Sequence, residues 1–138
     1  MDRISDIQLN LAIQQHEVPK LRAEVGWARR DQDFPRLFEL CLFWAGMRDE
    51  HGELIAFGYM AGPGLEHGYI EDIIVHPNYQ RSGIGEQLVR TLLLEAEKRD
   101  IGIVTVTYQE KHREFYERAG FEFCSDGVWR KSSDEYDT

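Results

Sequence analysis

The sequence predicts a single three-layer α/β domain, and three observations support this prediction. Short β-rich runs alternate with amphipathic segments of helical period along the chain. With 138 residues, the chain can bury one core but is too short for two ordinary domains. A content of 42% hydrophobic and 12% aromatic residues is typical of a folded globular protein. We therefore expect one domain over residues 1–138, in which the acidic and small residues of 132–138 form a flexible tail.

The N-terminal part is expected to form one strand and two helices. Apolar and polar residues alternate from Ile7 to Ile13, which is the period of a half-buried strand. A helix is expected over Pro19–Trp27, because proline is favoured in a first turn and Gly26 stands near the end. A second, shorter helical stretch is expected over Phe34–Leu40.

Three strands are expected next. The β-rich segments Leu42–Met47 and Leu54–Met60 flank residues 48–53, which have the composition of a hairpin loop. The tripeptide 62–64, Gly-Pro-Gly, breaks the following connection, and Gly68–Val75 reads as another strand.

The C-terminal part is expected to alternate between helices and strands. An amphipathic helix is predicted over Ile84–Arg99, and the β-branched run Ile103–Tyr108 predicts a strand. A further helix is expected over Glu110–Ala119, ended by the glycine that follows it. Phe121–Phe123 and Val128–Lys131 are expected to close the sheet as two short strands around a turn.

Charge and cysteine content restrict the class of protein. The net charge of −9 at pH 7 disfavours nonspecific binding to nucleic acid, which requires clustered Lys and Arg. Cys41 and Cys124 have no metal or redox spacing, and Cys41 lies in an apolar run and is expected in the core. No apolar run approaches the length of a membrane span, and Met1–Ile4 lack the regions of a signal peptide. We expect a cytoplasmic protein with free thiols and without a metal, a membrane or a nucleic-acid partner.

The segment Gln80–Gly85 is the strongest functional signal in the chain. It follows an apolar run and opens the helix predicted from Ile84, and its two glycines, Gly83 and Gly85, allow close approach of the backbone to a ligand. A glycine turn that leads into a helix presents unpaired N–H groups and the positive end of a dipole. Strand, glycine loop and helix together indicate a site for the pyrophosphate of a ligand.

Two motifs, in the right order, resemble those of the GNAT superfamily of acetyl-CoA-dependent N-acetyltransferases. The first runs from Tyr69 through an apolar triplet and His-Pro into the loop, where Gln80, Gly83 and Gly85 match the family's Gln/Arg-x-x-Gly-x-Gly/Ala. The second, residues 115–121, resembles the family's Phe-Tyr-Glu-Lys-x-Gly-Phe. The resemblance covers about residues 69–122. It implies a three-layer fold around a mixed, mostly antiparallel twisted sheet, and acetyl-CoA as the cosubstrate.

The resemblance also implies which residues bind the cofactor. The pyrophosphate contacts are expected at Gln80, Arg81, Ser82, Gly83, Ile84 and Gly85, and the pantetheine arm is expected to bind main-chain groups near Ile73, Ile74 and Val75 where two strands splay apart. Gln109 and Phe115 are further cofactor candidates. Gln109 and His112 stand where many members have Asn and Ala, so that Gln109 can still contribute an amide, whereas His112 is expected on a solvated helix face.

Acetyl transfer to an amine requires a neutral nucleophile and a proton for the departing thiolate. Tyr116 matches the tyrosine that protonates the thiolate in many relatives, and the alternative is that it packs a helix on the sheet. Glu71 is the candidate base, directly or through water, or the carboxylate that positions the amine. Adjacent strand residues face opposite sides, so Asp72 is expected in a structural role. Trp27 either lines the acceptor wall or fills the core.

The leading hypothesis is an N-acetyltransferase that acts on a primary amine, most simply of a small molecule. Direct transfer in a ternary complex is favoured over an acetyl-enzyme, because neither motif contains a cysteine nucleophile. The alternatives are acetylation of a protein N-terminus or lysine, and a regulatory module that binds CoA without transfer. By analogy with relatives, a monomer or a homodimer is expected.

Overall fold

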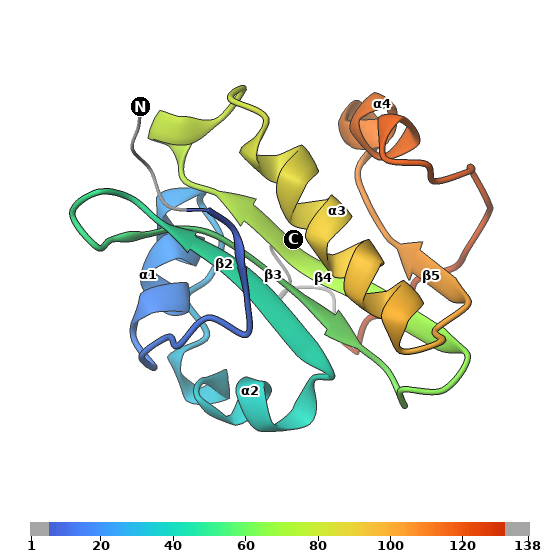
Figure 1. The fold of residues 1–138 in the computed structure, drawn as a ribbon, viewed down its shortest axis with the longest axis horizontal. Coiled ribbons are helices and arrows are strands. Elements are labelled where there is room, and N and C mark those ends of the chain that lie inside the picture. Colours follow the sequence, from blue (N-terminus) through green and yellow to red (C-terminus); the bar gives the residue numbers. More distant parts are fainter. Residues whose placement is uncertain (1–5, 132–138) are drawn as a thin grey trace.

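A five-stranded sheet runs through the centre of the protein (Figure 1). The computed structural model describes residues 6–131, so the tail expected at 132–138 lies outside the described residues. The first four strands are antiparallel neighbours, and the fifth runs parallel to the fourth. The sheet is therefore mixed and mostly antiparallel, as the resemblance implies. In spatial order, which is also chain order, its strands are β1 (Gln8–Leu9), β2 (Phe43–Arg48), β3 (Leu54–Ala61), β4 (His67–Val75) and β5 (Ile103–Val106).

Two helices cover each face of the sheet, which confirms the three layers. The helices α3 (Ile84–Lys98) and α4 (Arg113–Arg118) pack on one face, where Leu88, Leu92 and Tyr116 belong to the larger core. On the opposite face, α1 (Glu17–Glu24) and α2 (Arg36–Leu40) enclose a smaller core. Figure 1 shows α3 lying across the front of the sheet and α4 beside its first half. Short 3₁₀ turns occupy 31–33, 77–79 and 110–112.

Three predicted strands differ from the structure. The expected strand Ile7–Ile13 is reduced to β1, because Asn10 adopts a left-handed φ of 54° and its side chain accepts a hydrogen bond from the Trp44 N–H. The expected strands Phe121–Phe123 and Val128–Lys131 are wrong, since residues 121–131 have no regular structure. Phe121 packs against the larger core, but Phe123, Val128 and Trp129 are exposed, and 84% of the surface of Trp129 is accessible.

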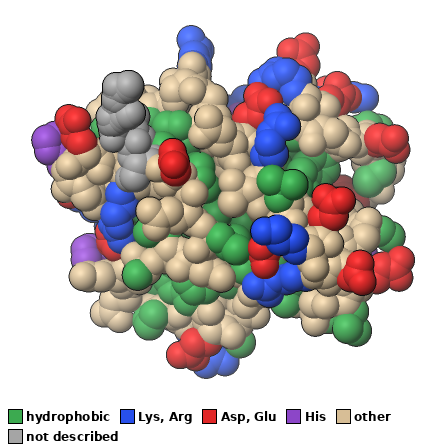
Figure 2. Space-filling view, viewed as in Figure 1, with side chains coloured by type: hydrophobic (Ala, Val, Ile, Leu, Met, Phe, Trp, Pro, Cys, Tyr) green, Lys and Arg blue, Asp and Glu red, His purple; other side chains and the backbone are tan. Residues whose placement is uncertain are grey.

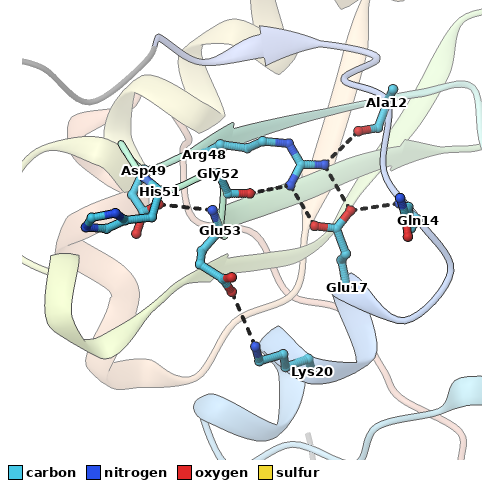
Figure 3. A network of polar contacts seen from close by, with 9 residues as sticks. All are labelled: Ala12, Gln14, Glu17, Lys20, Arg48, Asp49, His51, Gly52 and Glu53. Atoms are coloured by element: carbon cyan, nitrogen blue, oxygen red, sulfur yellow. Dashed lines mark hydrogen bonds and ion pairs between the residues drawn. The ribbon is translucent and has the colours of Figure 1, made fainter.

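A polar network fixes α1 to the β2–β3 hairpin (Figure 3). Arg48 forms a bidentate ion pair with Glu17, with Nη1–Oε1 and Nη2–Oε2 distances of 2.6 and 2.9 Å. The same guanidinium donates to the Ala12 and Gly52 carbonyls, while Lys20 pairs with Glu53 at 3.3 Å. The N-terminal half of α1 is thereby held at a defined place beside the hairpin.

Acidic and basic side chains are interspersed on the face that Figure 2 shows. Over α3, two ion pairs at helical spacing account for neighbouring opposite charges, Glu86–Arg90 at 2.9 Å and Glu95–Arg99 at 2.8 Å. No continuous basic surface is seen on this face.

Candidate active site

The loop between β4 and α3 is held by its own polar groups. Gln80 Nε2 donates to the Val75 carbonyl at 2.9 Å, and His76 Nδ1 accepts from the Asn78 N–H at 3.1 Å. The Ser82 hydroxyl donates to the Tyr79 carbonyl. These contacts fold residues 76–82 into a tight turn, which is tied to the rest of the protein by the bond from the His76 N–H to the Ile55 carbonyl at 2.8 Å and by that from the Tyr79 hydroxyl to Asp49 at 3.1 Å.

The N-terminus of α3 is open to a ligand. Gly83 is the N-cap residue, with a left-handed φ of 86°, and no side chain caps the helix. The first N–H groups of a helix have no partner within it, and the dipole makes this end partly positive. A Cβ placed on Gly83 would meet nothing within 4 Å, so there is space directly beside these N–H groups. This end of α3 can therefore accept an anionic group such as phosphate.

β5 pairs with β4 along its whole length but covers only the first part of β4. Their register ends at Ile70 opposite Val106, and β4 beyond this point pairs with β3 alone. Within residues 6–131, no strand covers the second edge of β4 beyond Ile70, and of its main-chain groups the Val75 carbonyl accepts from Gln80 Nε2. The side chains of Ile73, Ile74 and Val75 pack against the two cores, so the polar atoms that these positions offer a ligand are main-chain groups.

Tyr116 is a buried phenol, only 7% exposed, in a cluster of aromatic rings. It stacks on Tyr108 at a centroid distance of 4.9 Å and meets Phe115 and Phe121 edge to face. Among the described residues, its hydroxyl has no hydrogen-bond partner, which is unusual for a buried tyrosine. Burial raises the pKa of Tyr116 to about 12, so the hydroxyl keeps its proton at neutral pH.

Phe115 joins the aromatic cluster to the glycine turn. A Cβ placed on Gly85 would lie 3.3 Å from two ring atoms of Phe115 and 3.7 Å from Val75 Cγ2. The glycine is thus required for the close approach of α4 to the first turn of α3 and the end of β4. Of the predicted cofactor residues, the structure brings together Phe115, Gly85 and Val75, with Tyr116 next to them in sequence.

Glu71 and Asp72 lie on the same side of the sheet, which corrects the prediction that they face opposite sides. Tyr59 pairs with Glu71 and Phe57 with Ile74, so β4 has one extra residue between these pairs. This is a β-bulge, and Asp72 within it has a left-handed φ of 53°. Glu71 shares its face with Tyr59, which packs on the α1–α2 core, and Asp72 pairs with Arg22 of α1. The alternation of faces holds only outside such a bulge.

The surroundings of Glu71 favour its neutral form more than water does. The pKa of Glu71 is raised by desolvation first and by the charge of Asp72 second. Desolvation also raises the pKa of Asp72, whereas the guanidinium of Arg22 acts in the opposite direction. The pKa of Tyr59 is raised by burial and by both carboxylates. Glu71 is nevertheless solvent-exposed, so its carboxyl can reach a ligand on this face.

The remaining residues singled out from the sequence are Trp27, Gln109, His112 and Cys41. Trp27 is half-buried, packs on the α1–α2 core and has the Arg22 guanidinium 5.3 Å from its ring centre, so it is a packing residue that keeps part of its surface accessible. Gln109 and His112 are exposed, and desolvation and Lys111 lower the pKa of His112. Cys41 is half-buried rather than a full core residue.

Sequence reasoning missed Arg22, whose side chain is only 4% exposed. It occurs at helical spacing with Val18, Leu21 and Val25, on the apolar face of α1. A charged residue on such a face is the signal that could have identified it, because a buried cation requires a partner.

A separate cavity of about 290 Å³ lies between α1, the β2–β3 hairpin and the 77–79 turn. It is lined by His16, Glu17, Lys20, Leu21, Glu24, Asp49, Glu53, Leu54, Ile55, His76, Asn78 and Tyr79, and so includes neither Tyr116 nor Glu71. Within residues 6–131, no cluster of His, Cys, Asp and Glu could hold a metal ion. In the same range, none of the helices has the length and apolar character needed to cross a membrane.

Comparisons with known proteins agree with one another. A family model described as "Acetyltransferase (GNAT) family" matches residues 10–121. An uncharacterized N-acetyltransferase, ycf52 of Gracilaria tenuistipitata var. liui, is 25% identical over 126 residues, which are 88% of this chain and 69% of that protein. A GNAT-family acetyltransferase of Streptococcus pneumoniae TIGR4 has a TM-score of 0.75 at 24% identity and covers 95% of this chain and 100% of its own. Glucosamine-6-phosphate N-acetyltransferase of Arabidopsis thaliana has a TM-score of 0.75 at 18% identity, with 94% and 100% coverage. Both solved structures share the fold described above.

Proposed function

The chain belongs to the GNAT family of acetyltransferases, and from this premise we propose that it transfers an acetyl group from acetyl-CoA to the primary amine of a small molecule. The transfer is direct, with both substrates bound at once. The observation that carries the proposal is the buried hydroxyl of Tyr116, which has no hydrogen-bond partner among the described residues. Tyr116 is on α4, and the neighbouring Phe115 on the same helix lies against Gly85 of the glycine turn.

The described residues fit a cofactor of this kind. The open space at Gly83 and the free N–H groups of α3 suit the pyrophosphate, together with the loop residues Gln80, Arg81, Ser82, Ile84 and Gly85. The uncovered edge of β4 at Ile73–Val75 suits a chain with amide groups, which can hydrogen-bond as a strand would. Gln109 and Phe115 are the remaining residues proposed to contact the cofactor. Acetyl-CoA, when bound, supplies the acetyl thioester.

The protein's own residues then move the two protons. An alkyl ammonium has a pKa near 10, so the acceptor must lose a proton before it attacks. Glu71 is exposed on the α1–α2 face and can hold the ammonium and accept that proton, directly or through one water. Tyr116 keeps its phenolic proton at neutral pH and can donate it to the sulfur of the departing thiol. Trp27 lies on the acceptor side as part of the wall.

Direct transfer is supported by the state of the possible nucleophiles. Burial raises the pKa of the Cys41 thiol to about 11, so the thiol is protonated at neutral pH and is a poor nucleophile. The Ser82 hydroxyl donates to a main-chain carbonyl rather than to a base. Neither group is therefore activated to form an acetyl-enzyme.

The test is a screen for thiol release from acetyl-CoA with amines, amino sugars, polyamines and peptides as acceptors. We expect release with a small amine and its loss in Tyr116→Phe. Release with peptides alone would replace the small-molecule acceptor by a protein. Tight binding of acetyl-CoA without transfer to any amine would favour a regulatory CoA-binding module.

A further inference from the structure

Arg22 contacts three parts of the acceptor side at once. We propose that Arg22 is a positioning residue, which holds the segment that carries Trp27 against the β4 bulge and thereby fixes the place of Glu71. The inference rests on the proposed function, because it assigns Glu71 and Trp27 to the acceptor side. Nothing in the family motifs requires this arginine, which lies outside both of them.

The geometry is that of a clamp built on one guanidinium. Arg22 Nη1 lies 2.6 Å from Asp72 Oδ2 in the bulge, and Nε donates to the Ala28 carbonyl at 2.6 Å. The Cζ atom of the same guanidinium lies over the Trp27 ring, 5.3 Å from its centre. The Trp27 N–H also donates to the Arg22 carbonyl at 2.9 Å. The side chain and the main chain of Arg22 therefore both hold the segment that follows α1.

The other end of the clamp lies at a backbone position that needs support. Asp72 has a φ of 53°, a conformation that L-residues seldom adopt, and its side chain is 17% exposed. Bulges re-aim the side chains next to them, and Glu71 is the preceding residue. An ion pair that holds Asp72 in place therefore also determines the direction of Glu71.

Stability alone is a weak explanation for this pair. The free-energy cost of removing two charges from water offsets their mutual attraction. Proteins in which a buried ion pair is replaced by apolar residues are therefore often as stable as the original or more stable. A guanidinium that makes several directed contacts instead provides orientation, since its donors are fixed in one plane. The pair thus has the properties of a positioning device on the acceptor side.

The test compares Arg22→Lys with Arg48→Lys. Lysine keeps the positive charge beside the buried carboxylate but lacks the planar fork that reaches Asp72 and Ala28 together. Arg48 is the matched control, because it also pairs with a carboxylate at 2.6 Å, donates to main-chain carbonyls and contacts α1, at the hairpin rather than at the bulge. Trp27 is followed through the ¹⁹F resonance of 5-fluorotryptophan, and acceptor and cofactor kinetics are measured separately.

We expect Arg22→Lys to shift or broaden the Trp27 resonance and to raise the acceptor KM roughly ten- to a hundredfold, with the KM for acetyl-CoA unchanged. Arg48→Lys should lower Tm and leave the Trp27 resonance and both KM values as they are. The proposal is overturned if Arg22→Lys behaves like the control and changes Tm alone.

A second variant and a second readout separate a failure of this inference from a failure of folding or of the proposed function. If Arg22→Lys does not fold, Arg22→Met combined with Asp72→Asn removes both charges together, and the same changes in Trp27 and in acceptor KM are expected. If the wild type transfers acetyl to no amine, the proposed function fails. The Trp27 resonance then still tests the positioning role of Arg22, because a resonance that is unchanged in Arg22→Lys, or in the double variant that replaces it, would refute that role.

Discussion

The assignment of the glycine turn predicts a large and specific effect of Gly83→Asp on cofactor binding. In the wild type, acetyl-CoA at a hundredfold excess over Kd should stabilise the native state by about 2.7 kcal/mol. An unfolding entropy of about 2.1 cal/mol/K per residue gives about 0.29 kcal/mol/K for this chain, so Tm should rise by about 9 °C. In Gly83→Asp this rise should disappear, because the side chain enters the open space beside the α3 N–H groups and its charge repels phosphate.

Gly52→Asp is a closely matched control. Gly52 has a φ of 85° against 86° for Gly83, and a Cβ on either meets nothing within 4 Å. Both substitutions should therefore strain the backbone by about 1 kcal/mol and lower the Tm of the free protein by about 3 °C. Thermal unfolding with and without acetyl-CoA, followed by fluorescence or calorimetry, should show the full rise only in the wild type and in Gly52→Asp. A full rise in Gly83→Asp would refute the pyrophosphate site at this turn.

Three other substitutions test the remaining parts of the site and the fold. Tyr116→Phe should lower turnover by ~10²–10⁴-fold and leave Tm and acetyl-CoA binding nearly unchanged; normal turnover would reduce Tyr116 to a packing residue. Glu71→Gln should lower kcat/KM and move the rising limb of the pH–rate profile upward, towards the pKa near 10 of the free amine, with cofactor binding retained; an unchanged profile would exclude Glu71 as the base. Glu17→Gln should lower Tm by about 7 °C, corresponding to about 2 kcal/mol for charged hydrogen bonds to Arg48, without an effect on KM. The pKa of Glu17 is lowered, chiefly by Arg48, so this contribution is present above the ordinary carboxyl pKa of about 4.3 and is lost as the pH falls through the folded value; a difference in Tm that persisted at pH 2 would contradict it.

The sequence was sufficient for the elements between residues 42 and 118, because their periodicity is strong and both family motifs lie there. The predicted helix Ile84–Arg99 and strand Gly68–Val75 each agree with α3 and β4 to within one residue at either end. The C-terminal strands were predicted from a few apolar residues around a turn, and short runs of this kind do not determine whether a segment joins a sheet. Trp129, which is almost fully exposed, illustrates the difference.

The side of the sheet on which Asp72 lies could not be predicted either, and the reason is different. A bulge is defined by two residues opposite one on the neighbouring strand, so it depends on the register with β3 and not on the sequence of β4 alone. The same is true of Arg22, whose partner is 50 residues away along the chain. The motifs therefore located the cofactor side, whereas the acceptor side depends on contacts between distant segments.

Placing both carboxylates on one face has an electrostatic consequence that can be measured. The charge of Asp72 is one cause of the raised pKa of Glu71, and Arg22 offsets that charge only in part. Asp72→Asn removes the charge, while the amide oxygen can still accept from Arg22, so the bulge should keep its shape. The pKa of Glu71 should then fall, and the rising limb of the pH–rate profile should move to lower pH, opposite to the shift expected for Glu71→Gln. A limb that stays in place in Asp72→Asn, with normal kcat/KM, would show that the group responsible for it does not sense Asp72, and the base would have to be sought away from the bulge.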